Sequence, residues 1–197
     1  MKKKYCSKLV YVVALLAIYG GTTVALAQSA ENLKTENLKN KNVSIQYFNK
    51  MAKVLQSPRC LNCHPRGNQP LQGDDMHVHI MNVQRGLENH GAIGMKCATC
   101  HGTENNLNSG VPGAPKWGLA PRNLAWVGLT VHDLCMKIRD PKKNGGMSLE
   151  KLIHHNGEDK LVGWAWNPGP NHVPAPSTQQ EFGEDTRKWV ESGAVCP

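Results

Sequence analysis

The sequence predicts a mainly α fold, in which residues 43–197 form a single compact domain of short helices joined by long loops. Three observations support this fold class. N-cap signals precede several short amphipathic segments. No segment shows the alternation of apolar and polar residues that is typical of a strand. Pro and Gly, 12 and 19 residues in the whole chain, punctuate two long segments between the expected helices, residues 111–128 and 164–177.

Residues 1–27 have the layout of a secretory signal peptide. Four lysines accompany an uncharged, mostly apolar run over residues 9–19, and Ala25-Leu26-Ala27 is a small-x-small cleavage site. The alternative is an uncleaved membrane anchor, but glycines and threonines at 20–23 interrupt the run, and a spanning helix needs about 20 apolar residues. We therefore expect an exported protein, periplasmic or secreted, that begins at Gln28 and does not span a membrane after cleavage.

The charge of the chain changes with this cleavage. The whole chain carries +8, and removal of the four signal-peptide lysines leaves +4. No cluster of Lys and Arg with interleaved aromatic residues remains, so nucleic acid is not an expected partner. Residues 28–42 are polar and rich in Lys and Asn, and we expect them to form a flexible arm.

The domain itself is expected to begin with a helix over residues 44–56, which Pro58 ends. Residues 65–96 follow as an irregular segment. Three later helices have recognisable starts, because a hydroxyl residue precedes each one at the N-cap position. These helices are expected from Thr130 to Pro141, over residues 149–156 after Ser148, and from Thr178 to about Ser192.

Two short motifs carry the chemistry of the chain: residues 60–64 read CLNCH and residues 97–101 read CATCH. In a Cys-x-x-Cys-His motif, two thiols add across the vinyl groups of one haem, and the adjacent His binds its iron. We therefore predict two covalently attached c-type haems. The residues that bind them are Cys60, Cys63, His64, Cys97, Cys100 and His101, of which His64 and His101 are the iron ligands.

Other interpretations of the two motifs are weaker. A zinc site would be unusual, because the gap between Cys63 and Cys97 is long and structural zinc needs no His directly after the second Cys. A thiol–disulfide motif would sit near a βαβ pattern, which the sequence does not offer. Two tandem cytochrome domains would need a wider separation than 37 residues between the motifs. The sequence thus predicts one cytochrome c-like domain with both haems.

Several histidines compete for the sixth position of each iron. If residues 76–80 are extended, His77 and His79 lie on one face and either could bind a haem. On the expected helix 149–156, His155 flanks the apolar stripe while His154 points away from it. His77, His79 and His155 are therefore the candidate distal ligands, and solvated polar residues are the alternative. No strand or helix pattern singles out the remaining histidines, which are expected at the surface or in loops: His90, His132 and His172.

Two cysteines remain after the motifs and the signal peptide, Cys135 and Cys196. In an oxidising compartment such a pair most often forms a disulfide, although two free thiols are the alternative. The bond would close a loop of about 60 residues and stabilise the fold by about 4 kcal/mol.

The sequence also resembles a known family. The segments SPRCLNCHP, PLQGDDMHVH, MKCATCHG, VPGAPKWGLAP, DPKKNGG, LVGWAW and GAVCP are similar to exported di-haem c-type cytochrome-like proteins that are often labelled isoquinoline 1-oxidoreductase subunits. The resemblance covers roughly residues 45–197 and implies haem binding at the two motifs. The family pattern also includes positions that match His77, His79 and His155.

The family label implies an electron carrier and not the oxidising enzyme. A molybdenum hydroxylase needs iron–sulfur centres, and Cys135 and Cys196 are too few to hold a cluster with four thiolates. We therefore expect a periplasmic protein that passes single electrons from a dehydrogenase or oxidoreductase donor to a respiratory acceptor. The alternatives are a peroxidase-like haem enzyme and a haem-based ligand sensor, each of which needs one open iron. No triad, phosphate loop or paired-carboxylate motif suggests other catalysis.

Overall fold

The computed structural model describes residues 5–197, with side-chain detail from Gln28 onward. The chain is mostly helical, 47% helix and 5% strand, which confirms the expected helical class. It divides into a first unit that ends at Asn42 and a second unit, Val43–Pro197. The two units are described separately.

The first unit is helical. Helix α1 spans Tyr5–Leu55, and the side chains of residues 28–42, the segment expected as a flexible arm, are all exposed along it. The expected signal peptide, residues 1–27, lies outside the residues whose side chains are described. Within the described part of the chain, no helix combines the length and apolar character needed to cross a membrane.

The helices of the second unit begin at the hydroxyl and acidic caps that their sequences contain. Thr130, Ser148 and Thr178 each accept a hydrogen bond from a backbone N–H three residues later, as predicted, and Thr178 completes a capping box with Glu181. A short extra helix follows Asp159, whose side chain caps it. The helices after α1 are α2 (Pro58–Leu61), α3 (Val131–Arg139), α4 (Leu149–Glu158), α5 (Lys160–Gly163) and α6 (Gln179–Glu191).

Residues 65–96 are more ordered than the sequence predicts, because they contain two small antiparallel hairpins. Strand β1 (Leu71–Gln72) pairs with β2 (His77–Val78), in the register Leu71↔Val78. Strand β3 (Gly91–Ala92) pairs with β4 (Met95–Lys96), in the register Gly91↔Lys96. Each strand is only two residues long, which is too short to show a strand period in the sequence. Single turns of 3-10 helix complete the loops: η1 (Ile80–Asn82), η2 (Cys97–Thr99), η3 (Arg122–Leu124) and η4 (Trp164–Trp166).

The apolar core lies between the helices of the second unit. The last turns of α1 contribute Phe48, which packs against Trp189 of α6 with ring centroids 5.3 Å apart. Leu134 of α3 and Phe182 of α6 are likewise buried. Cys135 and Cys196 form a disulfide, the pairing that the sequence predicts, and it joins α3 to the end of the chain.

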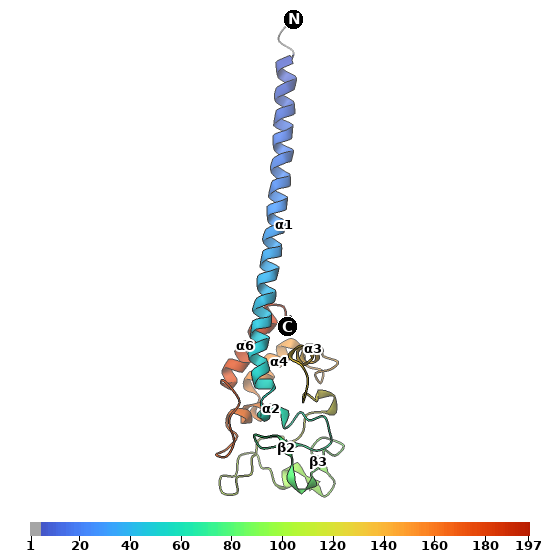
Figure 1. Ribbon diagram of the computed structural model, residues 1–197, viewed down its shortest axis with the longest axis vertical. Coiled ribbons are helices and arrows are strands. Elements are labelled where there is room, and N and C mark those ends of the chain that lie inside the picture. The colour runs from blue at the N-terminus through green and yellow to red at the C-terminus, as the bar shows by residue number, and fades with distance from the viewer. Residues whose placement is uncertain (1–4) are drawn as a thin grey trace. The chain divides into compact units, whose positions relative to one another are not determined.

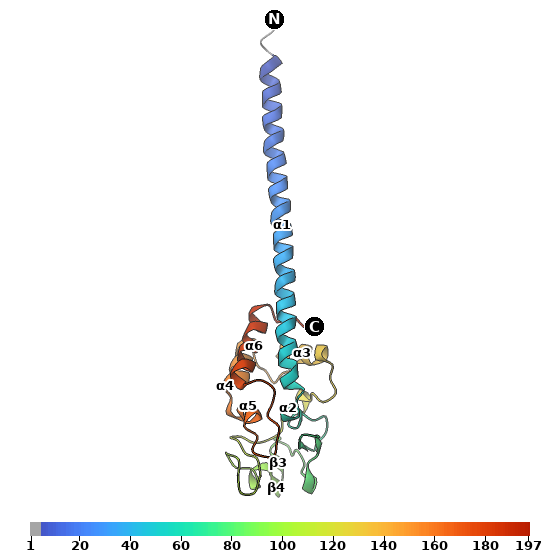
Figure 2. The same ribbon diagram turned by 60° about the vertical axis from the view of Figure 1, so that its left-hand side comes forward.

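The loops that contain the two Cys-x-x-Cys-His motifs lie at the opposite end of the second unit from this helical core. Figures 1 and 2 show α3, α4 and α6 at one end and the β-hairpins at the opposite end, with the short helix α2 between them. The packed helices therefore form a support from which the loops of residues 60–120 extend.

Candidate functional site

The first motif sits on one helical turn. Pro58 opens α2 at a position where no N–H is needed, and Asn62 caps its end. The N–H groups of Cys63 and His64 both donate to the carbonyl of Cys60, at 3.2 Å each. This turn brings the two thiols and the imidazole of the motif close together, as thioether attachment to one porphyrin edge requires.

The imidazole of His64 is oriented by two residues far along the chain. Its Nδ1 donates to the carbonyl of Leu124 at 2.7 Å, and its ring stacks on Trp126 with centroids 3.4 Å apart and planes at 7°. Burial lowers the pKa of His64 to about 4, against the opposing effect of the Leu124 carbonyl. The ring is therefore neutral with its proton on Nδ1, which leaves the Nε2 lone pair free for a metal.

The second motif repeats this arrangement with different partners. The N–H groups of Cys100 and His101 donate to the carbonyl of Cys97 at 3.2 and 2.9 Å. His101 Nδ1 donates to the carbonyl of Pro112 at 2.6 Å, and its ring stacks on Trp117 with centroids 4.7 Å apart. Burial lowers the pKa of His101, while the Pro112 carbonyl acts in the opposite direction. Its Nε2 is likewise free.

Both motifs line one mostly apolar cavity of about 470 Å³. Cys63 reaches it from the first motif, whereas Cys60 and His64 do not line it; Cys97, Cys100 and His101 reach it from the second motif. Trp117 and Trp164 also line it, and their rings meet edge to face, with centroids 4.9 Å apart. The cavity lies within the range of ligand pockets in proteins, about 300–1,000 Å³.

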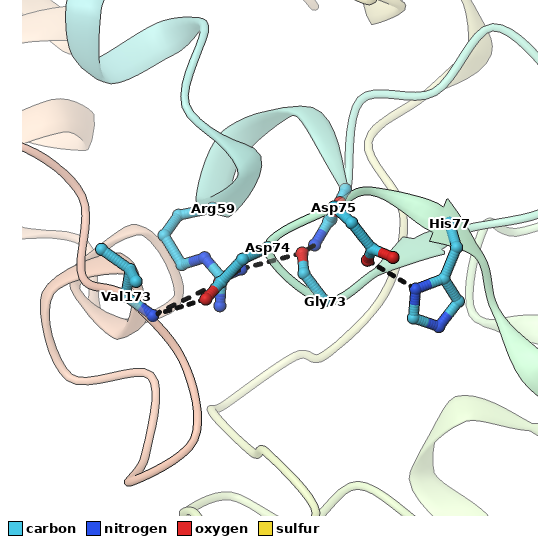
Figure 3. A network of polar contacts seen from close by, with 7 residues as sticks. Arg59, Gly73, Asp74, Asp75, His77 and Val173 are labelled. Atoms are coloured by element: carbon cyan, nitrogen blue, oxygen red, sulfur yellow. Dashed lines mark hydrogen bonds and ion pairs between the residues drawn. The ribbon is translucent and has the colours of Figure 1, made fainter.

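The two histidines of the β1–β2 hairpin have different surroundings, although the sequence placed them on one face. His79 lines the cavity, with its ring centroid 6.1 Å from that of His101. His77 does not line it; its Nδ1 lies 2.6 Å from a carboxylate oxygen of Asp75. Figure 3 shows this pair beside Gly73 and Asp74. Of the two residues, only His79 is placed to meet a group bound in the cavity.

Helix α4 carries the third candidate, His155. Its side chain is partly buried, and its Nδ1 lies 3.8 Å from a carboxylate oxygen of Asp159. His155 is also close enough to His64 to lower the pKa of that residue by charge repulsion. The adjacent His154 is exposed and pairs with Glu158, as expected for the outer face of this helix.

Burial favours the protonated form of three of the motif thiols. Burial raises the pKa of Cys60 to about 12 and that of Cys63 to about 11, and it also raises the pKa of Cys97. Thiol–disulfide exchange needs the opposite shift, because the thiolate is the reactive form. Among the described residues, no group of three or more His, Cys, Asp and Glu side chains could hold a metal ion.

Two buried arginines line the cavity as well, and sequence reasoning missed both. Arg59 is 3% exposed and Arg85 is 5% exposed. Arg59 Nη2 donates to Asp74 at 2.6 Å and to the carbonyl of Gly73 at 2.9 Å, as Figure 3 shows. Within the described part of the chain, Nε of both arginines and Nη1 of Arg59 have no hydrogen-bond partner. No sequence signal marks them except that Arg59 directly precedes the first motif.

The residues of this site fit haem. Each motif supplies two thiols and an imidazole with a free Nε2, and the mostly apolar cavity is lined by both thiols and the imidazole of the second motif and by Cys63 of the first. The two arginines add buried positive charge with unused donors, which suits a group that carries carboxylates.

Comparisons of the chain with protein-family models, with curated proteins and with solved structures find no match. The resemblance to di-haem cytochrome-like proteins therefore stays a prediction.

Proposed function

We propose that this protein is an exported di-haem c-type cytochrome that transfers single electrons. The observation that carries the proposal is the shared arrangement of the two motif histidines. His64 and His101 each follow two thiols on one turn, donate from Nδ1 to a backbone carbonyl, and stack on a tryptophan. A carbonyl bond of this kind fixes the tautomer and ring orientation of a metal-binding histidine.

The chain's own residues would hold and shield the cofactor. Cys60, Cys63 and His64 would hold one haem, and a second set at residues 97, 100 and 101 the other. When bound, haem c supplies an iron that cycles between two oxidation states. Trp126 and Trp117 keep the ligand rings in place, and the apolar lining of the cavity limits the access of water. Because one cavity is lined by both motifs, electron exchange between the two sites is part of the proposal.

The partners follow from this role. An exported carrier with two redox centres accepts electrons from a dehydrogenase or oxidoreductase and delivers them to a respiratory acceptor. The expected signal peptide and the disulfide between Cys135 and Cys196 support a compartment outside the cytoplasm, since disulfides persist in oxidising environments.

The proposal is tested by counting haems and recording their redox behaviour. The chain would be expressed with residues 1–27 in a host that attaches c-type haem during export, and purified. We expect two covalent haems per chain by pyridine haemochrome, and reversible one-electron reduction of both. The paired substitution Cys60→Ala with Cys63→Ala should leave one haem, and so should Cys97→Ala with Cys100→Ala.

Three outcomes would contradict this function. A protein without haem but with bound zinc would restore the zinc interpretation. Rapid turnover of peroxide would identify a peroxidase-like enzyme. A spectrum that changes on binding a small gas, without electron exchange, would identify a sensor.

A further inference from the structure

We infer that His79 is the second axial ligand of the iron that His101 binds, so that this iron is closed on both sides. The inference rests on the proposed attachment of a haem at Cys97 and Cys100. Its basis is the distance between the two imidazole rings. Their centroids lie 6.1 Å apart with planes at 71°, and both residues line the same cavity.

This distance is compatible with a shared metal ion. An imidazole nitrogen binds a first-row metal ion at about 2.0–2.1 Å, so two imidazoles on opposite sides of one ion have centroids about 6 Å apart. Rings packed directly edge to face have centroids about 4.5–7 Å apart, as Trp164 and His172 do at 6.4 Å, so the distance counts together with the shared cavity and the orientation of the His79 ring. The gap between His79 and His101 therefore matches one iron between them.

The backbone around His79 is fixed on both sides. The N–H of His79 donates to the carbonyl of Pro70 at 2.9 Å, and the N–H of Ile80 donates to the side-chain oxygen of Gln72 at 2.9 Å. Both acceptors lie in or next to strand β1, so the hairpin determines the position of the histidine. Gly73, in the turn of this hairpin, has φ +76°, a conformation that other residues rarely adopt.

The ring of His79 is also held in a metal-binding orientation. Its Nδ1 lies 2.7 Å from the carbonyl of Ile80, a bond that places the proton on Nδ1 and leaves Nε2 free. His64 and His101 make the same type of bond, to Leu124 and Pro112. His90 and His132 make this type of bond as well, but of these three histidines outside the motifs only His79 lines the cavity.

The other histidines considered for this position each lack one of these features. His77 is bound to Asp75 and does not line the cavity. His172 lines the cavity too, but the ring that it meets is that of Trp164, and within the described part of the chain its Nδ1 makes no hydrogen bond of the kind that His79 makes to Ile80. Two histidine ligands would make the iron low-spin and leave no position for an external ligand, which favours electron transfer over catalysis at this haem.

The inference is tested with His79→Ala in the full-length di-haem protein, with His77→Ala as the matched control from the same hairpin. We expect His79→Ala to keep two haems per chain, to convert one of them from low-spin to high-spin in visible and electron paramagnetic resonance spectra, and to bind carbon monoxide at that iron when reduced. Added imidazole should restore the low-spin spectrum. His77→Ala should match the wild type in every measurement.

A second variant covers the case in which His79→Ala does not assemble. His79→Met offers a different ligand at the same place, so one haem should stay low-spin and shift to a higher midpoint potential, as His/Met ligation does in cytochromes c. Wild-type spin state and potentials in both variants, at full haem content, would overturn the inference and leave the proposed function intact. A wild type without haem would overturn the proposed function itself.

Discussion

At the scale of single residues, the buried charge of Arg59 is the feature with the clearest functional consequence. Its guanidinium lines the cavity, lies over the face of Trp164 at 5.6 Å, and pairs with Asp74 at 2.6 Å. The side chain of Asp74 is 42% exposed whereas that of Arg59 is 1% exposed. Solvent therefore screens the carboxylate more than the guanidinium, and the pair leaves net positive potential towards the cavity.

This charge should set the midpoint potential of a haem in the cavity. Reduction removes one positive charge from the iron, so a nearby buried cation favours the reduced form. We expect Arg59→Gln to lower the midpoint potential by about 59 mV. This shift corresponds to a tenfold change in the equilibrium constant of a one-electron reduction. Asp74→Asn should shift it in the opposite direction, and spectroelectrochemical titration measures both.

The matched control is Arg66→Gln. Arg66 is exposed, and its Nε donates to the carbonyl of Val127, so its loss should leave the potential nearly unchanged. An equal shift in the Arg59 and Arg66 variants would show that net charge alone is responsible, and that burial of Arg59 has no special effect.

At the scale of elements, the contact between α4 and α6 depends on two glycines. A Cβ atom on Gly183 would lie 2.6 Å from the Cα of Gly157, a distance that real Cβ contacts essentially never show. The sequence predicts that α4 ends at Asn156-Gly157, but the helix continues to Glu158. Gly157 is therefore part of the helix and lets its backbone approach α6. In the same contact, Asn156 donates to the buried hydroxyl of Thr186 at 3.0 Å.

Substitution of Gly183 should thus destabilise the fold. We expect Gly183→Ala to lower the free energy of unfolding by about 1–3 kcal/mol, because the added methyl meets backbone that cannot move aside without separating the helices. Chemical denaturation followed by circular dichroism measures the change. Gly67→Ala is the control, because its nearest neighbour would be the nitrogen of Gln69 at 4.0 Å. Equal stability of the two variants would refute the close packing of α4 and α6.

At the scale of the whole second unit, the disulfide connects regions that are distant in sequence. Cys135 is fully buried in the core and lies 61 residues from Cys196. The segment that follows α6 is also bound to the start of this unit, because the hydroxyl of Ser44 accepts from the N–H of Val195 at 2.8 Å. The end of the chain therefore closes the helical core.

Loss of the disulfide should weaken this closure without affecting the proposed haem site. We expect the double substitution of Cys135 and Cys196 by Ala to lower the free energy of unfolding by about 4 kcal/mol, the value for a loop of this length. Haem content and spectra should stay as in the wild type. A reducing agent should shift the wild-type denaturation curve to that of the variant. A wild-type curve that does not change when the reductant is added would contradict the prediction.

Features that depend on near neighbours along the chain could be predicted from the sequence. The caps at Thr130, Ser148 and Thr178 were predictable because each hydroxyl meets a backbone N–H only three residues away. The Cys-x-x-Cys-His spacing likewise lies within one turn. The disulfide was predictable because two cysteines remained after the motifs in a chain that is expected to be exported.

The contacts that surround the candidate site depend on the tertiary fold. Leu124 and Trp126 contact His64 although they lie about 60 residues further along the sequence. No local sequence pattern predicts such contacts. The choice between His77 and His79 depends on a hairpin of two-residue strands, and the role of Arg59 depends on a loop that folds back over it. Hydrogen bonds and packing act through space, so residues far apart in the sequence can orient one imidazole only after the core has brought them together.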